Sequence, residues 1–314
     1  MPASIWKDYE VSFGNVAEAD YTIETGGAEI FSGHAVRRPD TAQLLVRIND
    51  VCADYLSHIL PSVTARGAAN DPCAVTFTVK DAGGNTVDAV QFVDDWSFDY
   101  DHPVSALSDP INGHLSAAQA LVFSVLSSAA TPVTLRFKDG TTQALSIAST
   151  GGPVQVVSVP LSSIANLAGI TAGGRSYTIV DACHRFALLY VNAFGGWDTL
   201  LMEGLSMEVD GYTRHLMAQR YDNNAASARG IKEYVNEVAR RWTLRTGWLS
   251  DGEAQRMHHV FGSTTVYLYD IPAGVAVPVT IGDDTCEYKT YRNTGAQMVN
   301  YTITANLAQE LIRR

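Results

Sequence analysis

The sequence of 314 residues lacks the motifs of several large enzyme classes. It contains no GxSxG, GxxxxGK[ST], HExxH or GxGxxG pattern, which excludes the common nucleophile, phosphate-loop, zinc-peptidase and dinucleotide signatures. Its glycine pairs, such as Gly83-Gly84 and Gly195-Gly196, stand at expected turns. We therefore expect a protein that is not an enzyme, with no catalytic residue, no cofactor and no metal site.

Cysteine is scarce, and its spacing is uninformative. Cys52, Cys73, Cys183 and Cys286 form no CxxC pair, and their gaps match no zinc or haem pattern. A disulfide between Cys52 and Cys73 is one interpretation of the first two. We favour the other interpretation, in which all four are buried free thiols in a reducing compartment.

Charge is also low, at 18% of residues against about 25% in typical globular domains. The formal net charge of −11 argues against a general nucleic-acid binder, because such proteins place Lys and Arg on phosphates. A negative surface would instead suit a wall past which DNA slides. DNA is therefore expected at most as passing cargo.

Long apolar runs are missing as well. The longest, around residues 186–191, is too short to span a bilayer, so we expect no membrane span. The amino terminus has no basic start followed by an apolar stretch, so no signal peptide is visible. We expect assembly in the cytoplasm.

What the sequence does have is strand-like alternation of apolar and polar residues. Residues 75–80 and 86–92 predict a hairpin, as do residues 133–138 and 143–147, each pair joined by Asp and Gly turn residues. Further strands are predicted at residues 42–51, 154–159, 176–180, 185–192, 199–205, 264–269 and 299–307. The expected fold is mainly β, with two or more antiparallel β-sandwich-like modules.

One or two short helices are expected in the carboxy-terminal part. Ser250 and Glu253 form a capping box, which precedes Met257, His258 and Phe261 at helical spacing and then Gly262. His258 is expected on the inward face of this helix. A second short helix is predicted at residues 231–239, and residues 115–127 fit either a helix or a strand.

These elements suggest four segments. Residues 1–60 form an amino-terminal β segment or arm, and residues 61–209 a β-sandwich region, which could hold two modules. Residues 210–230 form a linker or arm, and residues 231–314 a carboxy-terminal α+β module.

Two clusters of ionisable residues are candidates for a metal site or a catalytic dyad. Asp95, Asp99 and Asp101 would share one strand face and could hold calcium, but a charged sheet edge that prevents unwanted pairing explains the Asp94–Asp101 run better. Cys183 and His184 are neighbours that point to opposite faces of a strand, so they form no dyad.

Other ionisable residues offer no better site. Adjacent His258 and His259 diverge on a helix and do not chelate together. Glu203, Glu208 and Asp210 could include a glycosidase pair, but the sequence does not give the distance that this mechanism requires.

Tryptophans are more suggestive. Trp96, Trp197, Trp242 and Trp248 lie beside strand or turn signals, and such residues serve protein–protein or sugar-binding surfaces. Ordinary packing in the core or in strands is the alternative, and we favour it.

Three groups of phrases resemble uncharacterised virion proteins of tailed phages and prophages of Bacteroidetes. They are Ile30-Phe-Ser-Gly33 with Val46-Arg-Ile-Asn-Asp-Val-Cys-Ala-Asp-Tyr-Leu56, then Leu188-Leu-Tyr-Val-Asn-Ala-Phe-Gly-Gly-Trp-Asp198, and Thr246-Gly-Trp-Leu-Ser-Asp-Gly-Glu253 with residues 298–305. The resemblance implies a part of the tail, distal tail or baseplate, and it brings no catalytic residues.

The expected function is a structural virion subunit that forms a homo-oligomeric ring and contacts other virion proteins. Residues 1–20 and 210–230 would be assembly arms, and Asp94–Asp101 or Asp283-Asp284 would face a lumen. A carbohydrate- or receptor-binding β-sandwich is the first alternative, and a hydrolase on a β scaffold is the second.

Overall fold

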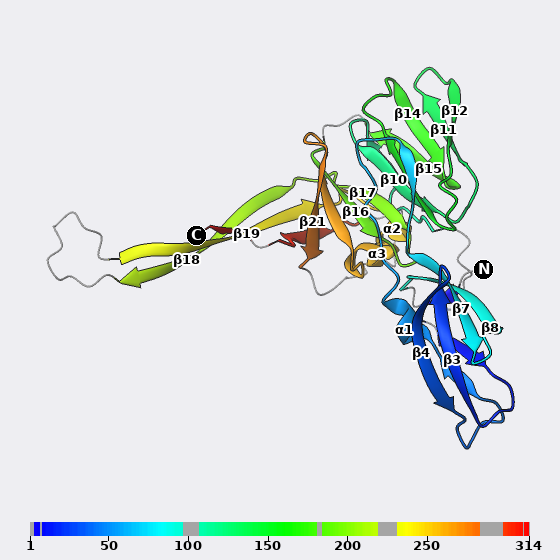
Figure 1. Ribbon diagram of the computed structural model, residues 1–314. Coiled ribbons are helices and arrows are strands. Elements are labelled where there is room, and N and C mark those ends of the chain that lie inside the picture. Colours follow the sequence, from blue (N-terminus) through cyan, green and yellow to red (C-terminus); the bar gives the residue numbers. More distant parts are fainter. Residues whose placement is uncertain are drawn as a thin grey trace, which may run out of the picture. The chain divides into compact units, whose positions relative to one another are not determined.

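The protein is mainly β, as predicted, with 53% of its residues in strands and 5% in helices. The computed structural model describes residues 3–6, 8–96, 107–180, 184–218, 231–282, 298–309 and 311–313. Contacts divide the chain into two compact units (Figure 1), which we call unit 1 (residues 1–181 and 191–199) and unit 2 (residues 182–190 and 200–314). The predicted four segments divide the chain at other residues. None of the described helices has the length and apolar character needed to cross a membrane.

The first sheet of unit 1 has five strands. Their order across the sheet is β1 (Ala3–Ser4), β8 (Thr86–Val93), β7 (Ala74–Asp81), β3 (Glu18–Thr25) and β4 (Ala28–Val36). Strands β7 and β8 are the first predicted hairpin, which is confirmed. The sheet packs on a core that includes Ile23, Phe77 and Phe92. The first twenty residues, predicted as part of a β segment or arm, contribute strands β1 and β2 (Glu10–Ser12) and the start of β3.

Residues 42–51 were predicted as one strand, and this prediction is wrong in its second half. Strand β5 (Leu45–Arg47) pairs with β2, and helix α1 (Asn49–Ala53) follows at once. The buried Asn49 explains the change, because its amide donates to Ile5 O at 2.6 Å and its Oδ1 accepts from Tyr9 N at 3.0 Å. These bonds hold the chain in a helical turn that buries Cys52.

The remainder of unit 1 is a β-sandwich with a shared apolar core. One sheet has the order β10 (Ala120–Val125), β13 (Gln155–Pro160) and β6 (Gly67–Asn70). The other has the order β12 (Thr142–Ile147), β11 (Thr131–Phe137), β14 (Leu167–Ala172), β15 (Arg175–Val180) and β9 (His114–Ser116). Strand β11 shows why the sheets pack, since Val133 and Leu135 are buried while Thr134 and Arg136 are exposed. The second predicted hairpin is confirmed here, and residues 115–127 prove to be strands.

A tight turn at residues 192–196 also belongs to unit 1. Asn192 Oδ1 accepts hydrogen bonds from the backbone nitrogens of Phe194 and Gly196 at 2.9 and 3.1 Å. Gly195 has φ +80°, in the left-handed region where glycine is favoured. A Cβ atom at Gly196 would lie only 2.1 Å from Leu107 O. The Asn-x-x-Gly-Gly pattern is therefore required by backbone geometry.

Unit 2 is built on one large sheet. Its strands run in the order β17 (Trp197–Leu201), β16 (Phe186–Val191), β20 (Val266–Asp270), β21 (Val275–Ile281), β22 (Thr302–Leu307), β19 (Ile231–Arg245) and β18 (Met207–Ala218), and β23 (Leu311–Arg313) also pairs with β19. The contact boundary crosses β16 and β17, so the ends of these two strands belong to unit 1.

The capped helix is confirmed, but the second predicted helix is not. Ser250 N donates to Glu253 Oε2 at 2.7 Å, and helices α2 (Asp251–Gln255) and α3 (His258–Phe261) follow, ending at Gly262. Residues 231–239, predicted as a helix, belong to strand β19. Residues 210–218, predicted as part of a linker or arm, belong to strand β18, and residues 219–230 lie outside the described part. Pairing along the whole of β18 outweighs a weak local helical pattern.

Gly196 provides a test of the tight turn. We expect Gly196→Ala to lower the free energy of unfolding by at least about 1–3 kcal/mol, because the new methyl group overlaps Leu107 O. Gly67→Ala is the control, since nothing lies within 4 Å of a Cβ atom there. Urea unfolding followed by circular dichroism measures both, and equal stability of the two variants would contradict this account.

Candidate functional site

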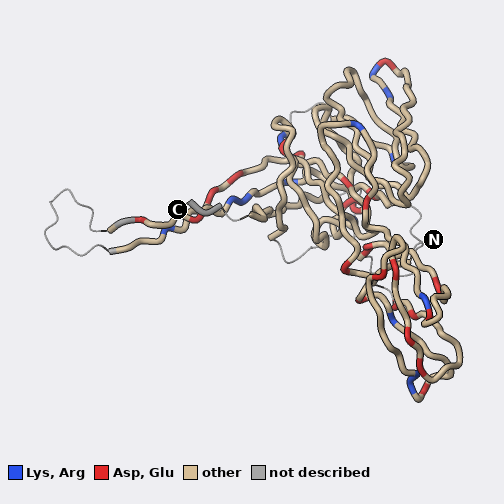
Figure 2. Tube along the Cα trace, viewed as in Figure 1, with Lys and Arg blue, Asp and Glu red and all other residues tan. Residues whose placement is uncertain are grey.

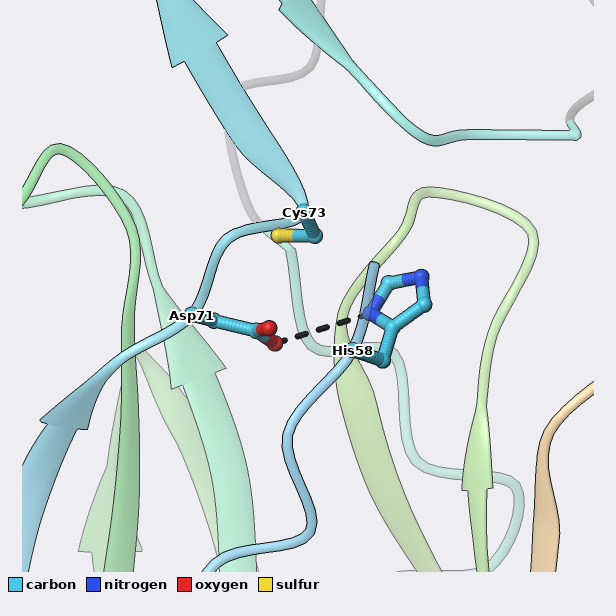
Figure 3. A group of neighbouring side chains, drawn as sticks. All are labelled: His58, Asp71 and Cys73. Atoms are coloured by element: carbon cyan, nitrogen blue, oxygen red, sulfur yellow. Dashed lines mark ion pairs between the residues drawn. The ribbon is translucent and has the colours of Figure 1, made fainter. Parts of the chain in front are cut away.

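A buried histidine of unit 1 lies between two carboxylates and a thiol (Figure 3). His58 belongs to the segment between α1 and β6, Asp71 follows β6, Cys73 precedes β7 and Asp94 follows β8. Backbone hydrogen bonds fix three of these positions. Asp71 N donates to Val154 O at 3.1 Å, and Asp94 N donates to Cys73 O at 2.8 Å. The ends of three strands thus bring together residues that are far apart in the sequence.

The two nitrogens of His58 face different carboxylates. Nδ1 lies 3.5 Å from Asp71 Oδ2, and Nε2 lies 3.3 Å from Asp94 Oδ2. The His58 side chain is 6% exposed, Asp71 is fully buried, and Asp94 is about one-third exposed. The 3.5 Å pair is longer than a hydrogen bond of good geometry. Within the described residues, His58 Nδ1 and Asp71 Oδ2 have no hydrogen-bond partner.

Burial and charge act on the cluster in opposite directions. Burial lowers the pKa of His58, but the carboxylates of Asp71 and Asp94 raise it more, to about 9. Burial, followed by the same two negative charges, raises the pKa of the Cys73 thiol well above its ordinary value. The imidazole therefore carries a proton at neutral pH and the thiol stays neutral. A protonated thiol is a poor nucleophile, so the cluster does not favour cysteine catalysis.

Three side chains of this cluster offer one metal ligand atom each. The imidazole nitrogen of His58, a carboxylate oxygen of Asp71 and Sγ of Cys73 all lie within 4.8 Å of one another. Figure 3 shows the three groups turned toward a common point. No sequence motif marks this site, because its single cysteine makes no Cys–Cys spacing and His58 lies 13 residues before Asp71.

A second buried polar group ties the turn at residues 192–196 to a neighbouring loop. Asp198 is fully buried and accepts hydrogen bonds from Ser108 Oγ, from Asp109 N at 2.8 Å and from Asn192 Nδ2 at 2.6 Å. Burial raises the pKa of Asp198 to about 7, although the three donors lower it. Asp198 is the last residue of the segment 188–198, which resembles the phage virion proteins. In this chain, Asn192 and Asp198 of that segment belong to one network of buried hydrogen bonds.

The acidic run predicted from the sequence is only partly described. Asp95 is buried, and Asp94 pairs with His58, so neither belongs to a charged edge or a lumen surface. That interpretation is wrong for these two residues, because Asp95 is withdrawn from solvent and Asp94 is engaged by His58. Asp99 and Asp101 lie outside the described residues, as do Cys183 and Asp283-Asp284.

The predicted thiol state is confirmed where it is described, since Cys52 and Cys73 are both free and buried. The prediction for the histidine pair is reversed: His259 is buried, while His258 is partly exposed and its Nδ1 lies 2.7 Å from Gln255 O. Residues 251–261 form two short helices, α2 and α3, and not one continuous helix, and in α3 the side chain that points inward is that of His259 and not that of His258.

Two of the three carboxylates that could form a glycosidase pair, Glu208 and Asp210, form ion pairs with an arginine. Arg240 Nε lies 2.8 Å from Asp210 and 3.3 Å from Glu208. Glu203 and Glu208 line a surface depression of unit 2 with His184 and Arg185, and Arg185 also pairs with Glu208 at 3.7 Å. Among the tryptophans, Trp197 and Trp242 are buried, Trp96 is half-buried and Trp248 is 65% exposed.

Strands β18 and β19 form a long hairpin that carries exposed apolar side chains, and we call it the docking hairpin. Residues 241–245 of β19 pair with β22, and residues 241–243 pair with β18 as well. The preceding part of β19, residues 231–240, pairs with β18 and, at residues 236–238, with β23. Figure 1 shows the two strands extending past the rest of this sheet. The exposed apolar side chains of the docking hairpin are between 46 and 60% exposed, namely Met207, Val209, Tyr212, Leu216, Met217, Ile231 and Tyr234.

Several charges on the docking hairpin form ion pairs within it. Arg240 binds Asp210, His215 Nε2 lies 3.0 Å from Glu237 Oε1, and Arg214 lies 3.9 Å from Glu233. The two strands contain five basic and four acidic residues. Unit 1, in contrast, holds 20 acidic and 9 basic residues and so accounts for the whole net charge, whereas unit 2 holds 13 of each. Figure 2 shows the acidic positions recurring along unit 1.

The raised pKa of His58 predicts a pH dependence of stability. Its protonated form contributes in full below the ordinary value of 6.5, and the contribution is lost as the pH rises through about 9. Unfolding free energies measured with a chelator present should fall by roughly 3 kcal/mol more between pH 6 and 9.5 in the wild type than in His58→Gln. The control is His34→Gln, an exposed histidine 2.7 Å from Asp20, which should follow the wild type. Parallel curves for His58→Gln would contradict the buried ion pair.

Asp198 supplies an independent test. We expect Asp198→Asn to lower the free energy of unfolding by about 1–3 kcal/mol, because the amide nitrogen faces groups that already donate hydrogen bonds. Asp139→Asn is the control, since Asp139 accepts hydrogen bonds from Thr141 at an exposed turn. An Asp198→Asn protein as stable as the control would show that the carboxylate is dispensable.

Comparison with known proteins assigns no family: no family model matches the chain, and no curated protein is significantly similar to it.

Proposed function

We propose that this protein is a structural subunit of a phage virion, in the tail, distal tail or baseplate, that assembles with copies of itself and with other virion proteins. The observation that carries the proposal is the docking hairpin, with its seven exposed apolar side chains on two strands. A two-stranded hairpin is marginally stable alone, and several large apolar side chains exposed on one element favour a protein–protein interface. The viral resemblance of the sequence agrees with such a role.

The proposed occupant of the docking hairpin is the acidic unit 1 of another copy. The hairpin has a slight excess of basic residues, whereas unit 1 holds 20 acidic and 9 basic residues. Complementary potentials guide association, while apolar contacts supply most of the affinity. Arg240 and His215 are already paired with Asp210 and Glu237, so fewer unpaired charges are covered when the surface is buried. A contact between different surfaces of successive copies is the kind that closes into rings.

An acidic unit 1 also agrees with DNA as passing cargo. Its excess of Asp and Glu would repel the phosphate backbone and keep a passage free of bound DNA. This role needs no catalysis, and the proposal therefore includes none. It places the protein in the virion after assembly in the host cytoplasm.

A carbohydrate- or receptor-binding β-sandwich is the alternative. Its best support is the exposed Trp248, a residue type that stacks on sugar rings. Trp242, the other tryptophan of unit 2, is buried, so this unit offers one exposed tryptophan and not a row. The hydrolase alternative has less support, because the carboxylates of Glu208 and Asp210 both bind Arg240.

A charged pair of substitutions on the docking hairpin tests assembly. The wild type should form closed rings or stacked tubes at micromolar concentration, seen by sedimentation velocity and negative-stain microscopy. Tyr212→Asp with Leu216→Asp should weaken association by about 30-fold or more, equivalent to the loss of about 2 kcal/mol at a hot spot.

Thr213→Asp is the matched control, since Thr213 is an exposed polar residue of the same strand. It should leave the assemblies unchanged. A wild type that stays monomeric, or a double variant that assembles as the wild type does, would overturn the proposal. Binding of a purified monomer to a glycan array would favour the alternative.

A further inference from the structure

The His58 cluster contains polar atoms that the folded chain leaves without hydrogen bonds. His58 Nδ1 and Asp71 Oδ2 are buried and have no hydrogen-bond partner among the described residues, although they lie only 3.5 Å apart. Buried polar atoms are nearly always satisfied, so two such atoms facing each other indicate a missing partner. Sγ of Cys73 lies within 4.8 Å of an imidazole nitrogen of His58 and of a carboxylate oxygen of Asp71.

We propose that His58 Nδ1, Asp71 Oδ2 and Cys73 Sγ bind one zinc ion. The tetrahedral geometry of zinc brings ligand atoms to separations of about 3.2–3.8 Å, given bonds of about 2.0–2.3 Å. The nitrogen–oxygen distance of 3.5 Å already lies in this range, and the sulfur needs a shift of no more than about one ångström. Three protein ligands leave the fourth position to a water molecule.

The donor set selects the class of metal. Calcium and magnesium prefer oxygen ligands, whereas a site with one nitrogen, one oxygen and one sulfur atom suits zinc and its transition-metal neighbours. The other described free cysteine, Cys52, is equally buried but belongs to no such group, and its pKa is raised to about 12 by burial alone.

Asp94 completes the arrangement on the opposite side of the imidazole. Its Oδ2 lies 3.3 Å from Nε2, where it can accept the Nε2–H hydrogen bond and leave Nδ1 free to bind a metal. Carboxylates in this position are usual behind histidines that ligate zinc, because they fix the tautomer and the ring orientation. Asp71 Oδ1 accepts from Ile59 N at 3.2 Å, so the carboxylate that would bind the metal is also oriented.

Zinc would replace two protons in this cluster. Binding at Nδ1 displaces the proton that His58 carries at neutral pH, and binding at Sγ displaces the thiol proton of Cys73. One divalent ion in exchange for two protons leaves the net charge of the cluster unchanged. The buried site therefore takes up the ion without adding charge to the interior of unit 1.

Cobalt(II) is the probe, since its bond to a thiolate gives a charge-transfer absorption that zinc lacks. The full-length chain is freed of metal and titrated with cobalt(II), and zinc is then added as a competitor. We expect one cobalt ion per chain, a thiolate–cobalt absorption, and its loss when zinc is added. Calorimetry in two buffers near pH 7 should show the release of about two protons per zinc ion.

Matched variants locate the site. Cys73→Ala should abolish the absorption, and Cys52→Ala should retain it. Asp94→Ala should weaken zinc binding by about 10- to 100-fold. Because Cys73→Ala could fail to fold, a variant that keeps Cys73 as its only cysteine, with Cys52, Cys183 and Cys286 changed to Ala, provides the second test. Its thiolate–cobalt absorption would support the proposal. Absence of that absorption in the folded variant or in the wild type, or its survival in Cys73→Ala, would overturn it.

Discussion

Asp71 and Asp94 are two carboxylates that share one buried imidazole, and the joint between the two parts of unit 1 depends on this contact. Asp71 ends strand β6 of the sandwich, and Asp94 ends strand β8 of the first sheet. Without a positive group between them, two acidic side chains would face a buried space of low dielectric constant, which is costly. His58 provides that group, and the Trp197 ring, nearly perpendicular to the imidazole with 6.3 Å between the ring centroids, helps to enclose it. The two carboxylates favour the protonated imidazole, and this is why the pKa of His58 is raised.

The buried network of Asp198 acts on a neighbouring part of unit 1 through a similar principle. Its carboxylate collects donors from residues 108–109 and from Asn192, so that loop and turn are held by charge-assisted hydrogen bonds. Gly195 and Gly196 then permit close approach of the backbone to Asp94 O and Leu107 O. The buried carboxylates of Asp71 and Asp198 thus hold loop and turn residues of unit 1, namely His58 and Ile59 for Asp71 and residues 108–109 and 192 for Asp198. The interior of unit 1 is specified by polar contacts as well as by its apolar cores.

Local signals in the sequence predicted local structure well. The capping box at Ser250 depends on residues three apart, and the hairpins at 75–92 and 133–147 depend on a turn and the alternation beside it. The prediction failed where distant contacts decide the structure. Residues 231–239 have a helical spacing of apolar residues, yet they pair along β18. Asn49 lies in the predicted strand 42–51, but its bonds to Ile5 and Tyr9 make it the start of a helix.

The candidate site was harder to predict for the same reason. The cysteine spacings give Cys73 no metal-binding pattern, and His58 belongs to no motif. Their proximity depends on the ends of β6, β7 and β8 meeting, which sequence spacing does not reveal. The Asn192–Asp198 phrase was noticed as a pattern, but its role follows only from the Ser108 and Asp109 contacts. Functional residues of this kind have no motif, because the fold and not the sequence interval sets their distance.

In the proposed zinc site, a proton and the metal ion would compete for the same imidazole nitrogen of His58. In the metal-free state the proton on His58 holds the two carboxylates together, and this contribution weakens as the pH rises toward 9. Zinc binding strengthens over the same range, since fewer protons must be displaced. A ligand at 100 times its dissociation constant stabilises a fold by about 2.7 kcal/mol, which is of the order of the contribution that the proton gives up. A cluster of this design can therefore hold the ends of the two sheets together whether or not the metal is present, with the metal taking over where the proton is lost.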